Sequence, residues 1–212
     1  MLDIKNYKNR IEKAARPNLG DFGNNILYKM CENYPGHKEE SVIIGKIWLI
    51  GRAYAASVER RRNKEKNEVS DNFYIKKVMP AIRASNIDKW LSALDSGKGI
   101  NEQNILKILQ THNNLLKTLF DLTGQNKRSL SSKYLHFHKP NLFFIYDNRA
   151  SGTLGKFVDR VPKENANGVD KTYSIFVRKC LNLQDKIRDE LRVNLTPRQL
   201  DNFIIDIANN GI

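Results

Sequence analysis

One segment near the middle of the chain combines a lysine with a following carboxylate. It reads SLSSKYLHFHKPNLFFIYDNRA over 129–150, with Lys133 in a short helical pattern and Asp147 at the end of a compact apolar run. The neutral amine of a lysine can attack an electrophilic carbon and form a Schiff base, but at its ordinary pKa the amine is almost wholly protonated. Burial lowers that pKa because the charged form loses its water, and the aromatic residues beside Lys133 favour burial. Lys133 is therefore a candidate nucleophile; the alternative is a solvent-facing lysine on a basic protein.

Asp147 follows the apolar run 143–146 directly and opens the next helical pattern. A buried run is rigid, so it carries the carboxylate to a fixed place. One interpretation is a helix N-cap, because aspartate accepts hydrogen bonds from the first backbone N–H groups of a helix. The other is chemical, since a carboxylate at the mouth of a cleft can stabilise a developing cation or activate a water. The two interpretations are compatible.

The elements that must position these residues are helices. Apolar residues recur at three- and four-residue steps along almost the whole chain, which predicts an all-α fold. The run 143–146 resembles a strand but has no partner nearby. We expect one compact unit over 1–212 with two lobes, formed by 1–95 with 165–212 and by 100–160. The expected helices cover 2–15, 20–33, 39–62, 71–84, 86–95, the stretch between Asn101 and Gly124, 148–158, 173–191 and the stretch that begins with the capping box at Thr196.

The charge indicates the kind of partner. The 212 residues carry a net charge of +13, and a field of that sign favours a polyanion. The alternative is a basic protein whose charge serves solubility alone. Two cysteines far apart in sequence and no signal-peptide pattern indicate a reducing, cytoplasmic setting. The most apolar stretch, 42–58, contains Lys46 and Arg52 and is too polar to span a membrane.

A helix that bears a lysine, then an apolar hairpin, then an aspartate that opens the next helix resembles the active-site region of helix-hairpin-helix DNA glycosylases, in particular the 8-oxoguanine glycosylase group. The resemblance implies an all-helical, two-lobed fold that acts as a monomer on double-stranded DNA, needs no metal or cofactor, and associates with the nucleoid when bound. It implies that Lys133 attacks the anomeric carbon, displaces the damaged base and then cleaves the strand. Asp147 would assist at the same carbon.

The hairpin departs from the family pattern. The family usually has Leu-Pro-Gly-x-Gly before the lysine, so that backbone N–H groups reach a phosphate, whereas this chain has Gly124-Gln-Asn-Lys-Arg-Ser129. We expect Lys127, Arg128 and Ser129 to supply the phosphate contacts instead. The separation between Lys133 and Asp147 is also shorter than the family's usual span. No cysteine cluster of the kind that holds an iron–sulfur centre in some relatives is present.

Further basic residues are candidates for contacts with phosphate. Arg52, Arg60 and Arg61 lie near the end of the expected helix 39–62, and Arg149 follows Asp147 closely. The alternative is a solvated helix C-terminus, where positive charge is favourable in any case. Aromatic residues could stack on an extruded base or belong to the core: Trp48, Tyr54, Phe73 and Tyr74.

The histidines indicate packing rather than metal binding. His136 and His138 lie two positions apart on a helix and face different directions, so they ligate one ion poorly. His112 falls on the apolar face of its helix and is expected in the core. Besides the glycosylase, two functions remain open: a non-catalytic helical DNA-binding module, possibly in a defence system, and a basic scaffold that binds an acidic protein.

Overall fold

Helices form where the sequence shows three- and four-residue apolar spacing, and the all-α prediction is confirmed. The computed structural model describes residues 1–60, 70–162, 164 and 166–211, and these ranges contain helices and no strand. Arg61 lies outside the described residues. The elements are η1 Ile4–Tyr7, α1 Lys8–Ala14, α2 Asp21–Asn33, α3 Glu40–Ala53, α4 Ser70–Phe73, η2 Tyr74–Val78, α5 Met79–Ala84, α6 Ile87–Ser92, η3 Ser96–Lys98, α7 Ile105–Thr123, α8 Arg128–His138, α9 Asn148–Leu154, α10 Lys171–Leu191 and α11 Pro197–Asn210.

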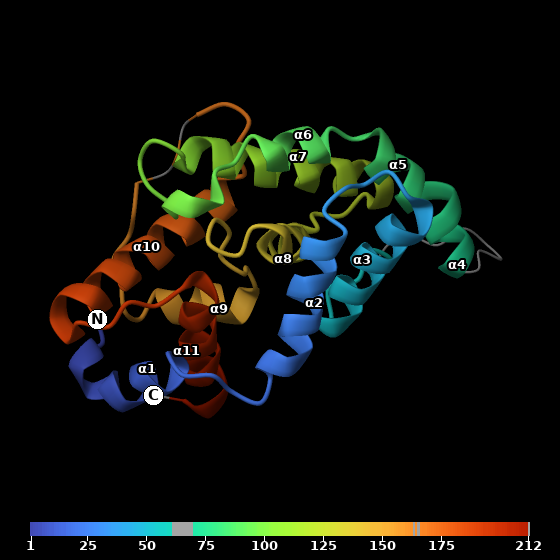
Figure 1. Cartoon of the computed structure of the whole chain (residues 1–212). Helices are drawn as coiled ribbons and strands as arrows, with labels where there is room; N and C mark the ends of the chain where they lie inside the picture. Colours follow the sequence, from blue (N-terminus) through green and yellow to red (C-terminus); the bar gives the residue numbers. More distant parts are fainter. Residues whose placement is uncertain (61–69, 163, 165, 212) are drawn as a thin grey trace.

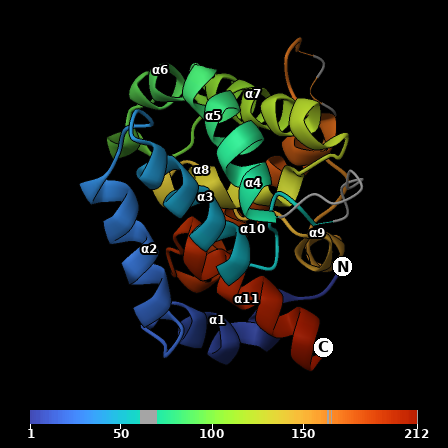
Figure 2. The same cartoon turned by 90° about the vertical axis from the view of Figure 1, so that its right-hand side faces the viewer.

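Two hydrophobic clusters form the interior. The first unites η1 and α1 with α9, α10 and α11, and the second unites α2 to α6 with α8. Helix α7 contributes to both, since Leu109 belongs to the first and Ile108 to the second. The chain ends lie near each other beside α1 and α11, and α8 runs through the middle of the molecule (Figure 1, Figure 2).

The division of the chain between the clusters differs from the lobes that we expected. The buried apolar residues between 27 and 94 share a cluster with those between 115 and 143, and not with those of the C-terminal helices. The reason is that α5 and α6 pack on α7, while α8 packs on α2, α3 and α7. The apolar run that precedes Asp147 crosses from one cluster to the other, because Phe143 belongs to the second cluster and Phe144 to the first. It therefore delivers Asp147 to the junction of the two.

Helix α3 ends earlier than predicted, at Ala53 and not near residue 62. A Schellman motif closes it: Ala56 N–H donates to Gly51 O at 2.8 Å, and Ala55 N–H donates to Arg52 O at 3.2 Å. Ala55 occupies the left-handed position with φ 48°, where glycine is usual and an L-residue costs roughly 1–2 kcal/mol. The motif turns residues 54–60 away from the helix axis and toward the start of α8.

Other helix ends follow local signals. Gly124 ends α7 in the left-handed conformation with φ 64°, and the capping box at Thr196 is present at the start of α11, as predicted. The start of α7 differs: Asn104 is the N-cap, and Asn101 Oδ1 accepts from Asn104 N–H in the preceding turn. None of the described helices combines the length and apolar character that crossing a bilayer requires.

Candidate active site

Lys133 and Asp147 line the same open pocket, which has a volume of about 550 Å3. Three segments build its walls: the turn 54–60 after α3, the stretch 125–133 that enters α8, and residues 146–149 at the start of α9. A volume of this size falls within the usual range for ligand pockets, about 300–1,000 Å3. A second cavity, of about 610 Å3, is lined by residues of α2, α6 and the end of α8 and is mostly apolar. Lys133 does not line that cavity. The candidate active site is therefore the first pocket, which contains both Lys133 and Asp147.

The Lys133 side chain is almost buried, with 5% of its surface exposed. Its Nζ donates to Ser129 Oγ at 2.8 Å and lies 3.5 Å from the Tyr54 carbonyl oxygen. The same atom sits 5.4 Å from the centroid of the Tyr54 ring. Within the described part of the chain, Lys133 forms no ion pair. Burial lowers the pKa of the amine, Asp147 and Asp201 oppose that shift, and Arg149 and Arg198 add to it.

The other buried lysine, Lys46, has a different environment. Its Nζ donates to the carbonyl oxygens of Tyr34 and Gly36 at 2.9 and 3.0 Å and approaches His37 Nε2 at 3.3 Å. An ammonium group has three donors, and here each has a partner. Burial lowers the pKa of Lys46 to about 8. Lys46 therefore holds the turn after α2 in place, whereas Lys133 faces an open pocket.

Asp147 caps α9 and also lines the pocket. Its Oδ1 accepts from the Ala150 N–H at 2.8 Å, which is the N-cap bond that the sequence predicts. Its Oδ2 lies 3.9 Å from Arg149 Nη2, a distant contact that leaves this oxygen able to face a ligand. The cap fixes the direction of the carboxylate, and the pocket gives it access to a substrate.

Four of the predicted basic residues line the pocket, and Arg128 is the one of them that is held by a carboxylate from another helix. Arg60, Lys127 and Arg149 are among its lining residues. The Lys127 ammonium donates to the Arg60 carbonyl oxygen. The Arg60 guanidinium in turn donates to the carbonyl oxygen of Ala55. The Arg149 side chain is 65% exposed and donates to Asn209 Oδ1 at 3.0 Å. Arg60, Lys127 and Arg149, which we call the basic rim, thus bring three positive charges to the pocket that Lys133 lines.

The three remaining predicted contacts each have a partner within the protein, and two of them, Arg128 and Ser129, also line the pocket. Arg128 binds Asp170 through two bonds of 2.6 and 2.7 Å, so its guanidinium ties α8 to the N-cap of α10. Arg52 pairs with Glu59 at 2.5 Å and lies outside the pocket lining. The Ser129 hydroxyl accepts from the Lys133 amine. Local sequence could not reveal the first of these pairs, because Arg128 and Asp170 are far apart in the chain.

Among the aromatic candidates, Tyr54 lines the pocket. Its hydroxyl donates to Asn24 Oδ1 at 2.6 Å, which fixes the plane of the ring. Phe73 and Tyr74 are buried in the second cluster, and Trp48 lies on the surface against the Arg52 guanidinium. Tyr54 is thus the candidate for stacking on a base.

The histidines have the packing roles that the sequence predicts. His136 is buried; its Nδ1 donates to the Phe143 carbonyl at 2.8 Å, and its Nε2 accepts from the Tyr28 hydroxyl at 2.6 Å. Burial lowers the pKa of His136 to about 4, so the ring is neutral at physiological pH. His112 is also buried and stacks on Tyr173, with ring centroids 3.7 Å apart.

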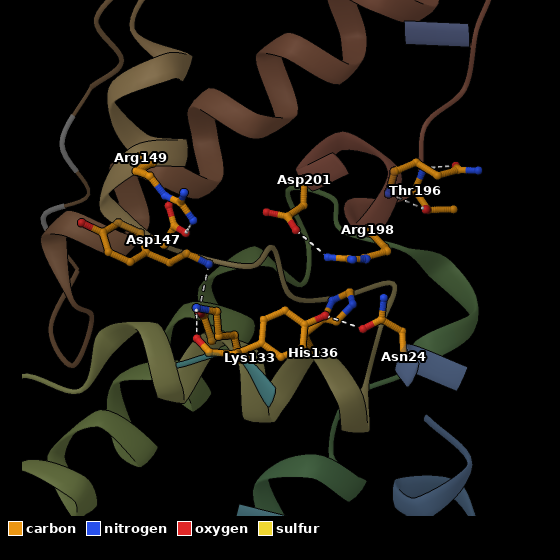
Figure 3. Close-up of polar contacts among 12 residues, drawn as sticks. Asn24, Lys133, His136, Asp147, Arg149, Thr196, Arg198 and Asp201 are labelled. Atoms are coloured by element: carbon orange, nitrogen blue, oxygen red, sulfur yellow. Dashed lines mark hydrogen bonds and ion pairs between the residues drawn. The ribbon is translucent and has the colours of Figure 1, made fainter. Parts of the chain in front are cut away.

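Sequence reasoning missed two residues of α11 that lie near Tyr54 and Lys133, although neither lines the pocket. Figure 3 shows Asp201 and Arg198 across a common space from Lys133 and His136, with Asp147 and Arg149 beside it. Arg198 Nη1 donates to Asp201 Oδ2 at 2.7 Å, and the guanidinium carbon lies 5.9 Å from the Tyr54 ring centroid. In sequence the pair resembles an ordinary surface ion pair at i,i+3 spacing, because only the packing of α11 brings it inside.

No protein-family model, no curated protein and no solved structure matches this chain. The resemblance to helix-hairpin-helix DNA glycosylases therefore rests on the segment 129–150 and on the helical architecture.

Proposed function

We propose that this protein is a DNA glycosylase with associated strand-cleaving (AP lyase) activity that removes a damaged or modified base from double-stranded DNA. One observation carries the proposal: the Lys133 amine is nearly buried, has no ion-pair partner among the described residues, and opens onto a pocket that it shares with Asp147. A solvent-facing lysine would instead be exposed, and a structural one would have its donors satisfied, as Lys46 does. Among bases, 8-oxoguanine is suggested by the resemblance alone.

The chemistry follows from the two side chains. The neutral amine of Lys133 attacks C1′ of a nucleotide extruded from the duplex, and the C1′–N bond breaks as the electron pair leaves with the base. Asp147 stabilises the positive charge that develops on the sugar. Opening of the sugar ring then gives a Schiff base with Lys133, from which the strand is cleaved by elimination. Burial supports this role because it keeps a larger fraction of the amine neutral at physiological pH.

The charge distribution supports DNA as the partner. The net charge of +13 favours a polyanion, and the basic rim places three cations around the pocket that holds Lys133. A phosphate backbone bound along this rim would present a single extruded nucleotide to the pocket. The rim residues contact phosphates and so set register without reading sequence.

The test is covalent trapping on DNA that carries an abasic site. Borohydride reduces a Schiff base to a stable adduct, so the wild-type protein should form one and Lys133→Gln should not. Lys127→Gln is the matched comparison: loss of a rim lysine should weaken DNA binding, but the adduct should still form at saturating DNA because the proposed nucleophile remains. DNA binding with no wild-type adduct would favour a non-catalytic binding module, and an absence of DNA binding would favour a basic scaffold.

A further inference from the structure

Ala55 has a strained backbone conformation on the wall of the pocket that holds Lys133. Its φ is 48°; among the other described residues with positive φ, four are glycine and one, Arg192, is not. An L-residue is strained in this region because its Cβ crowds the neighbouring carbonyl oxygen. Such a conformation persists only where the surrounding structure enforces it.

Backbone contacts hold the turn in this conformation. A Cβ built on Gly51 would lie 3.0 Å from the Cα of Ser57, so the chain folds back closely onto α3 at this point. The Ala56 N–H donates to the Gly51 carbonyl oxygen at 2.8 Å, and the Arg60 guanidinium donates to the Ala55 carbonyl oxygen. Each of these contacts uses the backbone of the turn and not the Ala55 methyl group. Glycine at position 55 would make the same contacts without the strain.

The fold makes little use of the Ala55 methyl group. Ala55 is exposed, and the second hydrophobic cluster includes its neighbours Tyr54 and Ala56 but not Ala55 itself. Packing within the protein therefore does not offset the strain, because a methyl group gains its stabilising effect only by leaving water. Strained residues of this kind gather at ligand-binding sites. The methyl group thus has a use outside the fold, in contact with a ligand.

The position of Ala55 in the pocket indicates which part of a ligand it contacts. Ala55 lines the pocket together with Lys133 and Asp147. The preceding residue, Tyr54, has its carbonyl oxygen 3.5 Å and its ring centroid 5.4 Å from Lys133 Nζ. A nucleotide with its C1′ at Lys133 would place its base, which is bonded to C1′, along the wall that Tyr54 and Ala55 form.

We propose that Ala55 is a specificity-determining residue whose methyl group contacts the extruded base and limits its size, an inference that rests on the proposed glycosylase function. A larger side chain would occupy the place of the base, and glycine would leave a gap beside it. The methyl group therefore sets the width of the pocket where the base lies. Contact with the base buries this group and so offsets the strain in the turn.

The experiment measures the stability and two reactions of the full-length chain. Ala55→Gly relieves the strain, so the midpoint of thermal unfolding should rise by about 2–4 °C. Base release is measured in single turnover on duplexes that carry 8-oxoguanine or another damaged base. The protein concentration that gives the half-maximal rate should rise about fourfold, because one buried methyl group is lost. Trapping on a preformed abasic site, where no base is present, should change by less than about twofold.

A larger side chain at the same position gives the converse test. Asparagine adopts the left-handed conformation more readily than most L-residues, so Ala55→Asn should keep the turn. Its amide would extend into the place of the base, and base release should fall by about tenfold or more while abasic-site trapping is retained. Ala53→Gly is the control, because Ala53 is exposed at the end of α3 and lies outside the pocket lining. That variant should be less stable than the wild type and should release the base normally.

The outcomes separate this inference from the proposed function. If the wild type releases the base and Ala55→Gly does so equally well, or loses base release and abasic-site trapping to the same extent, the methyl group does not contact the base. If Ala55→Gly is no more stable than the wild type, the strain is offset within the fold, and this inference fails. If the wild type neither traps the abasic site nor releases any base, the glycosylase proposal fails and this inference fails with it.

Discussion

The Lys133 ammonium donates to the Ser129 hydroxyl one helical turn earlier in α8, at 2.8 Å. A hydroxyl that accepts from an ammonium stabilises its protonated form and so holds the pKa of the lysine up. Burial acts in the opposite direction and prevails, since the pKa of Lys133 is lowered. The hydroxyl thus moderates how much neutral amine the site contains.

Replacing Ser129 by alanine should lower the pKa of Lys133 further. We expect the pH midpoint for abasic-site trapping to move to lower pH by roughly one unit or less, because one hydrogen bond to a charged group is lost. The measurement is the trapping rate as a function of pH. Ser131→Ala is the control, since Ser131 is buried in the same helix and its hydroxyl has no hydrogen-bond partner among the described residues. An unchanged midpoint would show that the hydroxyl does not act on the amine, and a midpoint at higher pH would contradict the predicted direction.

Replacing Asp147 by asparagine should separate its two roles. Asparagine is as good an N-cap as aspartate, so α9 should stay intact and DNA binding should survive. Loss of the negative charge should slow base release by about 10²–10³, the usual cost of removing one electrostatic group from an active site. Base release in single turnover and the unfolding midpoint are measured on the same preparations. Unchanged turnover would remove Asp147 from the mechanism.

Asp201→Asn should stabilise the fold at high pH. The carboxyl has a raised pKa in the folded protein, about 6 against an ordinary 3.8, so the folded state binds this proton more tightly than the unfolded state does. The stabilisation that the protonated Asp201 carboxyl gives the fold is complete below the ordinary pKa, and it is lost as the pH rises through about 6. At pH 8 the free energy of unfolding of the variant should therefore exceed that of the wild type by on the order of 1–3 kcal/mol. The difference should shrink toward pH 4.

The control for this stability prediction is Asp206→Asn. Burial would raise the pKa of Asp206, but hydrogen bonds from Arg10 and Asn210 outweigh it and lower that pKa. The pKa shift of Asp206 is thus opposite in sign to that of Asp201. Asp206→Asn should therefore be less stable than the wild type at neutral pH. Urea unfolding between pH 4 and pH 8 measures the free energy of unfolding of both variants and of the wild type. If Asp201→Asn is less stable than the wild type at pH 8, the surroundings of Asp201 stabilise its ionised form. That result would contradict the raised pKa.

Arg149→Gln should weaken DNA binding in a salt-dependent manner. Each phosphate neutralised contributes about 0.9 to the slope of log affinity against log salt concentration, so the loss of one contact should reduce the slope by that amount. Arg83→Gln is the control, because Arg83 is an exposed arginine on α5 outside the pocket lining and pairs with Glu40. Equal slopes for the two variants would exclude Arg149 as a phosphate contact.

Local signals account for the helices that the sequence predicts correctly. The apolar stripe of α7 and its glycine cap lie within one stretch, as do the capping residues of α11. The end of α3 could not be predicted, because Ala55 takes the left-handed position that glycine normally marks. The partition into two clusters also depends on long-range packing, which periodicity does not encode.

The same distinction applies to the site. Lys133 and Asp147 are joined by a short rigid segment, so their placement on one pocket follows from local sequence. Asp201 and Arg198 come near that pocket, without lining it, only because α11 packs on α9 and α1. Arg128 also lines the pocket, but its bond to Asp170 could not be predicted, because Asp170 lies beyond α9 in the chain.

The most direct test locates the covalent bond. After borohydride trapping on abasic-site DNA, the adduct is digested with protease and nuclease, and the modified peptide is sequenced by mass spectrometry. The mechanism predicts that the sugar remnant is attached to Lys133 Nζ. Attachment to another lysine or to the N-terminal amine, with Lys133 unmodified, would contradict it.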